Sequence, residues 1–150
     1  MNIETRKKLE QILLERKQNL KSIDEFDALF FRFSKRILKD AAMEINQSLE
    51  RLTGDFLKIY NDDPFEFSKS RYFIMVILNP RFNTNMINFN SNETSPCLKF
   101  EGKEINGRVV ISQRLIDDKS FKEITIFPIS ELTEEKTAEI LVKFLENIFK

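Results

Sequence analysis

The segment that decides the fold covers residues 24–61 and reads DEFDALFFRFSKRILKDAAMEINQSLERLTGDFLKIYN. Its apolar side chains recur at intervals of three and four residues, which is the spacing of one face of an α-helix. The members of this stripe are Phe26, Phe30, Phe33, Ile37, Ala41, Ile45, Leu49, Leu52, Phe56 and Ile59. A second stripe beside it includes Phe31, Leu38, Ala42 and Tyr60, so the apolar face covers about half of the circumference instead of the roughly 100° that one neighbour requires. The segment therefore predicts a long helix that packs against two neighbours.

The length of this predicted helix raises a question about where it ends. A straight helix of 38 residues measures roughly 57 Å at about 1.5 Å per residue, whereas a compact domain of this size is roughly 40 Å across. Either the helix breaks near Gly54, since glycine in a helix interior costs about 1 kcal/mol, or it projects into a partner. Met43 and Leu57 are apolar positions on its otherwise polar outer face, and they favour a partner there.

Shorter signals flank the long helix. Residues 3–20 predict a first helix with Leu9, Ile12, Leu13 and Leu20 on one side. The sequence Ser22-Ile23-Asp24-Glu25 matches a capping box, which predicts that the next helix begins at Ser22.

The rest of the chain predicts a sheet and a last helix. Five strand-like runs follow residue 64. The first is apolar at odd and even positions alike, as in an interior strand that is covered on both faces. They occupy residues 71–78, 82–90, 97–101, 108–113 and 121–127. Short links between consecutive strands favour an antiparallel meander. Residues 129–150 return to helical spacing through Ala138, Leu141, Phe144, Leu145 and Ile148.

These signals together predict one α+β domain over residues 1–150. It has two N-terminal helices, the second very long, then a five-stranded, mainly antiparallel meander sheet with an amphipathic C-terminal helix packed on it. The helical part is residues 1–61, the sheet residues 64–128 and the last helix residues 129–150.

Composition excludes several kinds of chemistry. The chain has 24 Lys and Arg, 24 Asp and Glu, no His, one Cys and three Gly. Without histidine there is no Ser-His-Asp or Cys-His catalysis and no HExxH zinc site. One cysteine makes neither an internal disulfide nor a CxxC metal site, and three scattered glycines form no phosphate-binding loop. The composition therefore predicts no cofactor and favours binding over catalysis.

Carboxylates offer the remaining route to an enzyme. Asp62-Asp63 and Asp117-Asp118 occur where turns and helix ends use Asp for local hydrogen bonds. Glu101-Gly102-Lys103 has the Glu-x-Lys order found in some metal-dependent nucleases, but Gly102 is also explained by a hairpin turn. A carboxylate–metal enzyme such as a nuclease is the least favoured of three hypotheses, and no metal ligand is assigned.

Basic side chains support a second hypothesis. Arg32, Lys35, Arg36 and Lys39 follow one another at i, i+3, i+4 and i+7 on the outer face of the long helix, where they are either a solvated face or a contact for phosphates. Arg71, Arg81 and Phe82 lie in or near an Asn-rich segment, residues 79–92, and would suit stacking on a single-stranded base. The same segment is equally explained as the solvated face and ends of an edge hairpin. A net charge of zero argues against a dedicated nucleic-acid binder. Nucleic acid is therefore kept as the alternative partner and is not the favoured one.

The favoured hypothesis is a non-catalytic protein–protein association module, such as an adaptor, a chaperone-like protein or a complex subunit, that forms a homodimer through the long helix. Its candidate partner contacts are Arg32, Lys35, Arg36, Lys39, Met43, Leu57, Arg71 and Arg81. No apolar run approaches the ~20 residues of a membrane span, and the N-terminus has no apolar leader. The expected location is therefore the cytoplasm.

Overall fold

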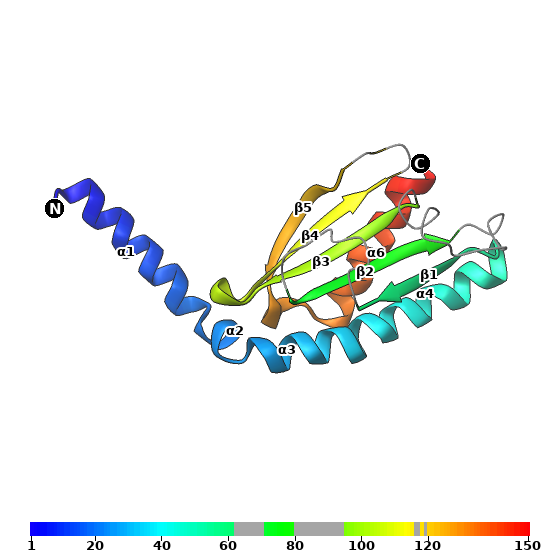
Figure 1. Ribbon diagram of the computed structural model, residues 1–150, viewed down its shortest axis with the longest axis horizontal. Helices are drawn as coiled ribbons and strands as arrows, with labels where there is room; N and C mark the ends of the chain where they lie inside the picture. The colour runs from blue at the N-terminus through cyan, green and yellow to red at the C-terminus, as the bar shows by residue number, and fades with distance from the viewer. Residues whose placement is uncertain (62–70, 80–94, 116–117, 119) are drawn as a thin grey trace.

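Five antiparallel strands form the centre of the molecule and pair in chain order, β1-β2-β3-β4-β5 (Figure 1). The computed structural model describes residues 1–61, 71–79, 95–115, 118 and 120–150. The strands are β1 (Phe56–Tyr60), β2 (Phe73–Asn79), β3 (Cys97–Lys103), β4 (Arg108–Arg114) and β5 (Lys122–Pro128). Every neighbouring pair is antiparallel, which confirms the predicted meander.

Helices precede and follow the sheet, as predicted. They are α1 (Ile3–Gln18), α2 (Leu20–Asp24), α3 (Phe26–Arg32), the π-helical turn η1 (Phe33–Ile37), α4 (Leu38–Leu52) and α6 (Glu134–Phe149). Two short 3-10 segments, η3 (Glu104–Asn106) and η4 (Ile129–Glu131), lie at the ends of strands. Helix α3, η1 and α4 continue into one another as a helix of 27 residues, so the α+β class and the long helix are confirmed. No helix in the described ranges combines the length and the apolar character that crossing a membrane requires.

The long helix ends at Leu52, which settles the question of its length. The backbone N–H groups of Thr53 and Gly54 both donate to the Leu49 carbonyl, and Gly54 has a φ of 83°. A left-handed glycine just after the last turn is the usual way to stop a helix. The break near Gly54 is thus the correct one of the two alternatives.

The helical assignment of residues 56–60 was wrong, because they form strand β1. Two hydrogen bonds from Asn46 of α4 hold this strand beside the helix: the Asn46 Oδ1 accepts from the Leu57 N–H at 2.7 Å, and the Asn46 Nδ2 donates to the Leu57 carbonyl at 2.9 Å. Leu57 points into the core and is 3% exposed. Its expected position on the outer face of a helix is therefore wrong, and its side chain is not presented to a partner.

Strands β2 to β5 match four of the five predicted runs. The remaining run, residues 82–90, lies outside the described residues. Strand β2 is buried throughout, as its apolar sequence predicts. Ile74, Val76 and Leu78 belong to the main core with the helices, whereas Phe73, Met75 and Ile77 form a smaller cluster with Cys97.

The capping box at Ser22 was a wrong prediction. Ser22 lies inside α2 and is buried; its hydroxyl donates to the Ser130 Oγ at 2.7 Å and accepts from the Ser130 N–H at 3.3 Å. The helix breaks fall at Asn19 and Glu25 instead. Ser22 therefore ties α2 to η4 rather than starting a helix.

Aromatic side chains hold the start of the long helix on the sheet. The Phe33 and Phe100 ring centroids are 5.3 Å apart, and the Phe26 ring meets the Tyr72 ring edge-on at 4.9 Å. Gly102 makes this approach possible, since a Cβ there would lie 2.5 Å from the Tyr72 Cβ and 2.8 Å from the Phe26 ring. Gly102 is thus a strand residue with a packing role, and the hairpin explanation for it was wrong.

We expect Gly102→Ala to lower the free energy of unfolding by about 1–3 kcal/mol, because an added methyl group in a closed contact forces its neighbours apart. Urea denaturation followed by circular dichroism measures the change. Ile105→Ala is the control, since Ile105 is largely exposed and should change stability by less than about 0.5 kcal/mol. Equal stability of the Gly102→Ala variant and the wild type would show that the aromatic contact is loose.

Candidate functional site

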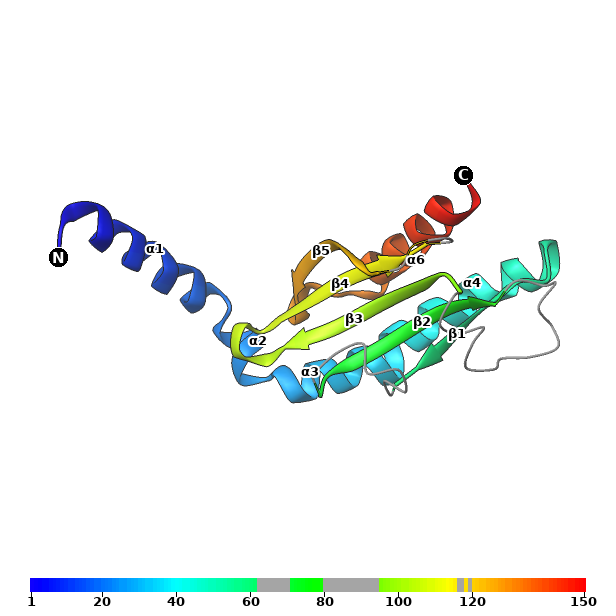
Figure 2. The same cartoon turned by 45° about the horizontal axis from the view of Figure 1, so that its top comes forward.

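An apolar groove of about 520 Å³ lies between α4 and α6. Both helices lie on the same face of the sheet (Figure 2). The groove is lined by Ala41, Glu44, Ile45, Ser48, Leu49, Leu52, Thr53, Ala138, Val142, Leu145 and Phe149. Among these, Leu52, Val142 and Phe149 are mostly exposed to solvent. Most of its lining side chains are apolar.

The groove exists because each helix carries a second apolar stripe. On α6, Thr137, Ile140, Leu141 and Phe144 are buried. Ala138, Val142, Leu145 and Phe149 follow at i, i+4, i+7 and i+11, which places them on one adjacent face. On α4 the groove residues Ala41, Ile45, Leu49 and Leu52 follow at i, i+4, i+8 and i+11, which likewise places them on one face. One apolar stripe of each helix packs against the sheet. The second stripes of α4 and α6 remain uncovered and form the groove.

The rim of the groove is acidic. Glu44 lines it directly. On α6, Glu139 and Glu146 are exposed and lie three positions before and four positions after Val142, so they stand next to it on the helix surface. Helix α6 as a whole has four glutamates and two lysines. One of these lysines, Lys143, pairs with Glu146 at 3.3 Å.

The sequence predicted part of this surface. Its periodicity assigned Leu52 to the apolar stripe of the long helix. The width of the apolar face predicted two neighbours, which are the sheet and α6. Met43, the predicted partner contact, is exposed but lies on the opposite side of α4 from the groove, two positions after Ala41. Val142 and Phe149 were missed, although their spacing of seven residues on one face was a usable signal.

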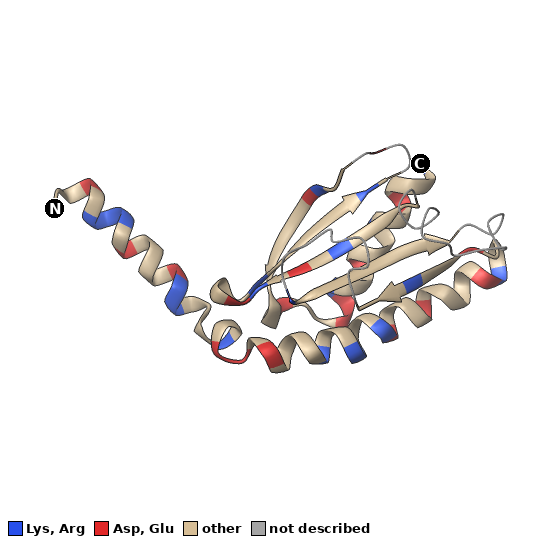
Figure 3. Cartoon of the chain, in the orientation of Figure 1, with Lys and Arg blue, Asp and Glu red and all other residues tan. Residues whose placement is uncertain are grey.

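The predicted basic ridge lies along the exposed side of the long helix. Arg32, Lys35, Arg36 and Lys39 are all exposed. Figure 3 shows that Lys and Arg positions recur along the long helix, with Asp and Glu positions among them. The π-helical turn η1 runs through the middle of the ridge. Arg81 lies outside the described residues.

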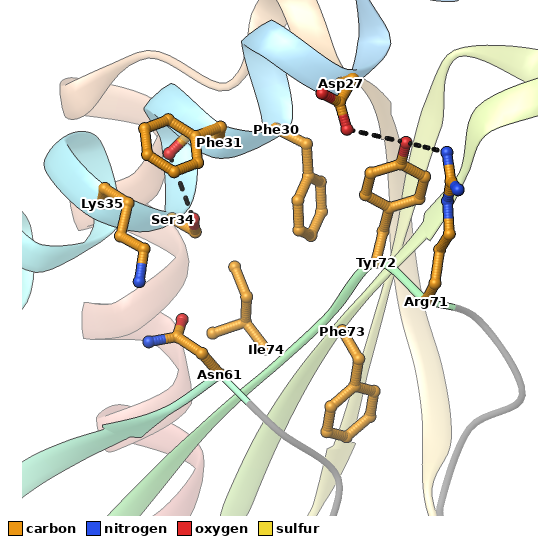
Figure 4. Close-up of a pocket in the computed structure, with 10 residues that line it drawn as sticks. All are labelled: Asp27, Phe30, Phe31, Ser34, Lys35, Asn61, Arg71, Tyr72, Phe73 and Ile74. Atoms are coloured by element: carbon orange, nitrogen blue, oxygen red, sulfur yellow. Dashed lines mark hydrogen bonds between the residues drawn. The ribbon is translucent and has the colours of Figure 1, made fainter.

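Two of the predicted contact residues, Lys35 and Arg71, come together at a second, smaller hollow of about 150 Å³ (Figure 4). The exposed Phe31 lies beside it on α3. The Arg71 guanidinium lies over the Tyr72 ring, 4.9 Å from its centroid, and away from Lys35. The hollow therefore presents the Lys35 ammonium group and the Phe31 ring, with Arg71 held at its side.

A chain of hydrogen bonds fixes the side of this hollow. The Tyr72 hydroxyl donates to the Asp27 Oδ1 at 3.0 Å and accepts from the Arg71 Nη2 at 2.8 Å. Arg71 also pairs with Glu104 at 3.3 Å. Burial raises the pKa of Tyr72; the Arg71 hydrogen bond opposes this, and the Asp27 hydrogen bond adds to it. The hydrogen bond to Tyr72, followed by the charge of Glu104, raises the pKa of Arg71. Both groups therefore keep their protons at neutral pH, and this set of hydrogen bonds joins α3 to the sheet.

The carboxylates singled out in the sequence do not assemble into a site among the described residues. Glu101 lies on β3 between Lys99 and Lys103, 3.8 Å from each ammonium group. Asp118 accepts a hydrogen bond from the Leu115 N–H at 2.9 Å, as expected of a turn residue. Asp62, Asp63 and Asp117 lie outside the described residues. Within the described ranges, three or more potential metal ligands are nowhere grouped.

We expect Tyr72 to ionise only above pH 10, the ordinary pKa of tyrosine. Because the folded protein holds this proton more tightly than the unfolded chain, the contribution of Tyr72 to stability is complete below pH 10 and falls as the pH rises through its raised pKa. Ultraviolet absorbance of tyrosinate in a Tyr60→Phe background reports Tyr72 alone, since the chain has two tyrosines. Asp27→Asn should move the titration to lower pH. Titration at or below the ordinary value would contradict the buried environment.

Comparisons with known proteins returned no match: no protein-family model, curated protein or solved structure is similar to this chain at the level that would show kinship. The functional assignment therefore depends on the surfaces of the chain itself.

Proposed function

We propose that this chain is a non-catalytic protein-association module that forms a homodimer through the α4 part of the long helix together with α6. The observation that carries the proposal is the open apolar groove between these two helices. Exposed apolar area costs about 25 cal/mol per Å² relative to its burial, and a continuous exposed apolar patch commonly marks a protein contact. A groove between two helices accepts an amphipathic helix, which is a recurrent way for proteins to bind each other.

The proposal moves the contact around the long helix from the position expected from the sequence. The outer face that carries Met43 is polar apart from that residue, whereas the groove brings together apolar side chains of two helices. Met43 and Val142 therefore represent two alternative contact surfaces. They are 54% and 53% exposed, so they form a matched pair for a test.

We expect the wild type to be a dimer at micromolar concentration, and Val142→Lys to weaken dimerisation at least about tenfold, or about 1.4 kcal/mol. An ammonium group in the middle of the apolar groove loses its hydration when a partner helix covers it. Met43→Lys should leave the dimer intact. Sedimentation equilibrium measures the dissociation constants, and circular dichroism checks that both variants fold. A monomeric wild type, or a dimer that Met43→Lys alone disrupts, would overturn the assignment to the groove.

A second candidate function is the binding of single-stranded nucleic acid. The observation that favours it is the hollow at Phe31 and Lys35, which offers an aromatic ring for stacking and an ammonium group for phosphate. Arg32, Arg36 and Lys39 continue the positive charge along the same helix.

For this candidate, we expect a mixed-sequence oligonucleotide to bind in low salt and to dissociate as salt is added. The triple change Arg32→Glu, Lys35→Glu and Arg36→Glu should abolish binding. Fluorescence anisotropy with a labelled oligonucleotide is the measurement, and Lys122→Glu, a charge reversal at an exposed position of β5, is the control. Binding that is unaffected by the triple change would eliminate the candidate.

The cytoplasm is the compartment we propose for the protein. The chain has a single cysteine, Cys97, which is buried, and proteins of reducing compartments rarely rely on disulfides.

A further inference from the structure

Helix α1 extends away from the rest of the molecule and buries none of its residues (Figures 1 and 2). Its apolar side chains Leu9, Ile12 and Leu13 are exposed, although they lie on one face of the helix. A helix of 16 residues whose apolar face is not buried is marginal in water, because most helical stability in proteins comes from burying such a face. The apolar stripe of α1 is therefore suited to packing against another surface, but it is exposed in this chain.

The dimensions of α1 fit the groove. At about 1.5 Å per residue, α1 is roughly 24 Å long. The groove runs from Ala41 to Leu52 on one side and from Ala138 to Phe149 on the other, which is roughly 17 Å by the same measure. One α1 is thus long enough to cover the apolar lining of one groove.

The charges of the two surfaces are opposite. Helix α1 has five basic residues and three acidic ones. The groove has Glu44 in its lining, and the exposed Glu139 and Glu146 stand beside Val142. Complementary charge around an apolar contact steers the correct partners together and disfavours other arrangements.

The helix cannot reach the groove of its own chain. The root of α1 is attached at η3, where the Arg16 guanidinium donates to the Ile105 carbonyl at 3.1 Å. From there α1 points away from the sheet, whereas the C-terminal halves of α4 and α6 lie at the other end of the molecule (Figure 1). The groove can therefore receive α1 only from another copy.

From these observations we propose that the α1 helix of a second copy of this chain fills the groove between α4 and α6, with the two copies exchanging their α1 helices reciprocally. A twofold-symmetric exchange fills both grooves and closes the assembly at two chains. This inference rests on the proposed function, since it names the element that the association groove binds.

A matched pair of substitutions on α1 tests the inference. Leu13 is 54% exposed and belongs to the apolar stripe, whereas Leu14 is 57% exposed and is turned about 100° from Leu13 around the helix. We expect Leu13→Glu to weaken the dimer at least about tenfold, because its carboxylate would meet an apolar groove with an acidic rim. Leu14→Glu should dimerise like the wild type. Sedimentation equilibrium of the full chain measures both.

Mixing two variants gives a sharper result. At a protein concentration well below the dissociation constants of the two variants, Leu13→Glu and Val142→Lys should each be monomeric alone. In an equimolar mixture they should form a heterodimer, because one groove then holds a wild-type contact and the other pairs the new glutamate with the new lysine. Native mass spectrometry distinguishes this heterodimer from either homodimer. A mixture of Leu14→Glu with Val142→Lys is the control. In its heterodimer only one of the two grooves holds an undisturbed contact, so the mixture should form no more heterodimer than that one contact supports.

The outcomes separate the inference from the proposed function. If Val142→Lys dissociates the dimer while Leu13→Glu leaves it intact, the groove is the contact but α1 does not fill it, and only the inference is overturned. If mixing the two monomeric variants restores no dimer, reciprocal exchange is overturned. If the wild type is a monomer, both the inference and the homodimeric module are overturned.

Discussion

The packing of aromatic rings from the long helix onto the middle of the sheet is the contact on which the rest of the structure depends. Phe26, Phe30 and Phe33 lie against Tyr72 and Phe100. This contact fixes the direction in which the long helix crosses the sheet, and hence where α4 lies when it reaches α6. The position of the groove follows from this direction, although none of these aromatic residues lines it. Rings contribute both buried area and a preferred mutual orientation, so they fix an angle better than aliphatic side chains do.

The fold was largely predictable because its elements have strong and separate periodicities. The last helix, strands β2 to β5 and the first half of the long helix each have one clear pattern. Strand β1 was missed because Phe56 and Ile59 continue the helical spacing of the preceding stripe, and only the conformation of Gly54 and the side chain of Asn46 reveal the turn. Ser22 shows the same limit: its local sequence suits a helix cap, but its hydroxyl bonds to a residue distant in sequence.

The candidate site was less predictable because it belongs to two helices at once. The width of the apolar face on the long helix indicated a second neighbour, but the sequence does not tell how much of that face the neighbour covers. Leu52 on α4 and Val142 on α6 become parts of one surface only through the crossing of the two helices. Met43 was predicted as a partner contact because it is an apolar residue on a polar face. A single exposed apolar residue is, however, ordinary on protein surfaces.

The π-helical turn η1 keeps the apolar stripe of the long helix on one side of that helix. From Phe26 to Leu52 the apolar stripe takes seven steps over 26 positions, which in a regular α-helix is about 7.2 turns, so the stripe would drift by nearly a quarter of a turn. A π turn takes up about one residue more than an α turn, which returns the count to close to seven whole turns. The wide turn thus acts as a phase correction: it keeps the apolar positions of a helix of 27 residues on one side, so that the stripe whose first half meets the sheet continues into the groove at its end.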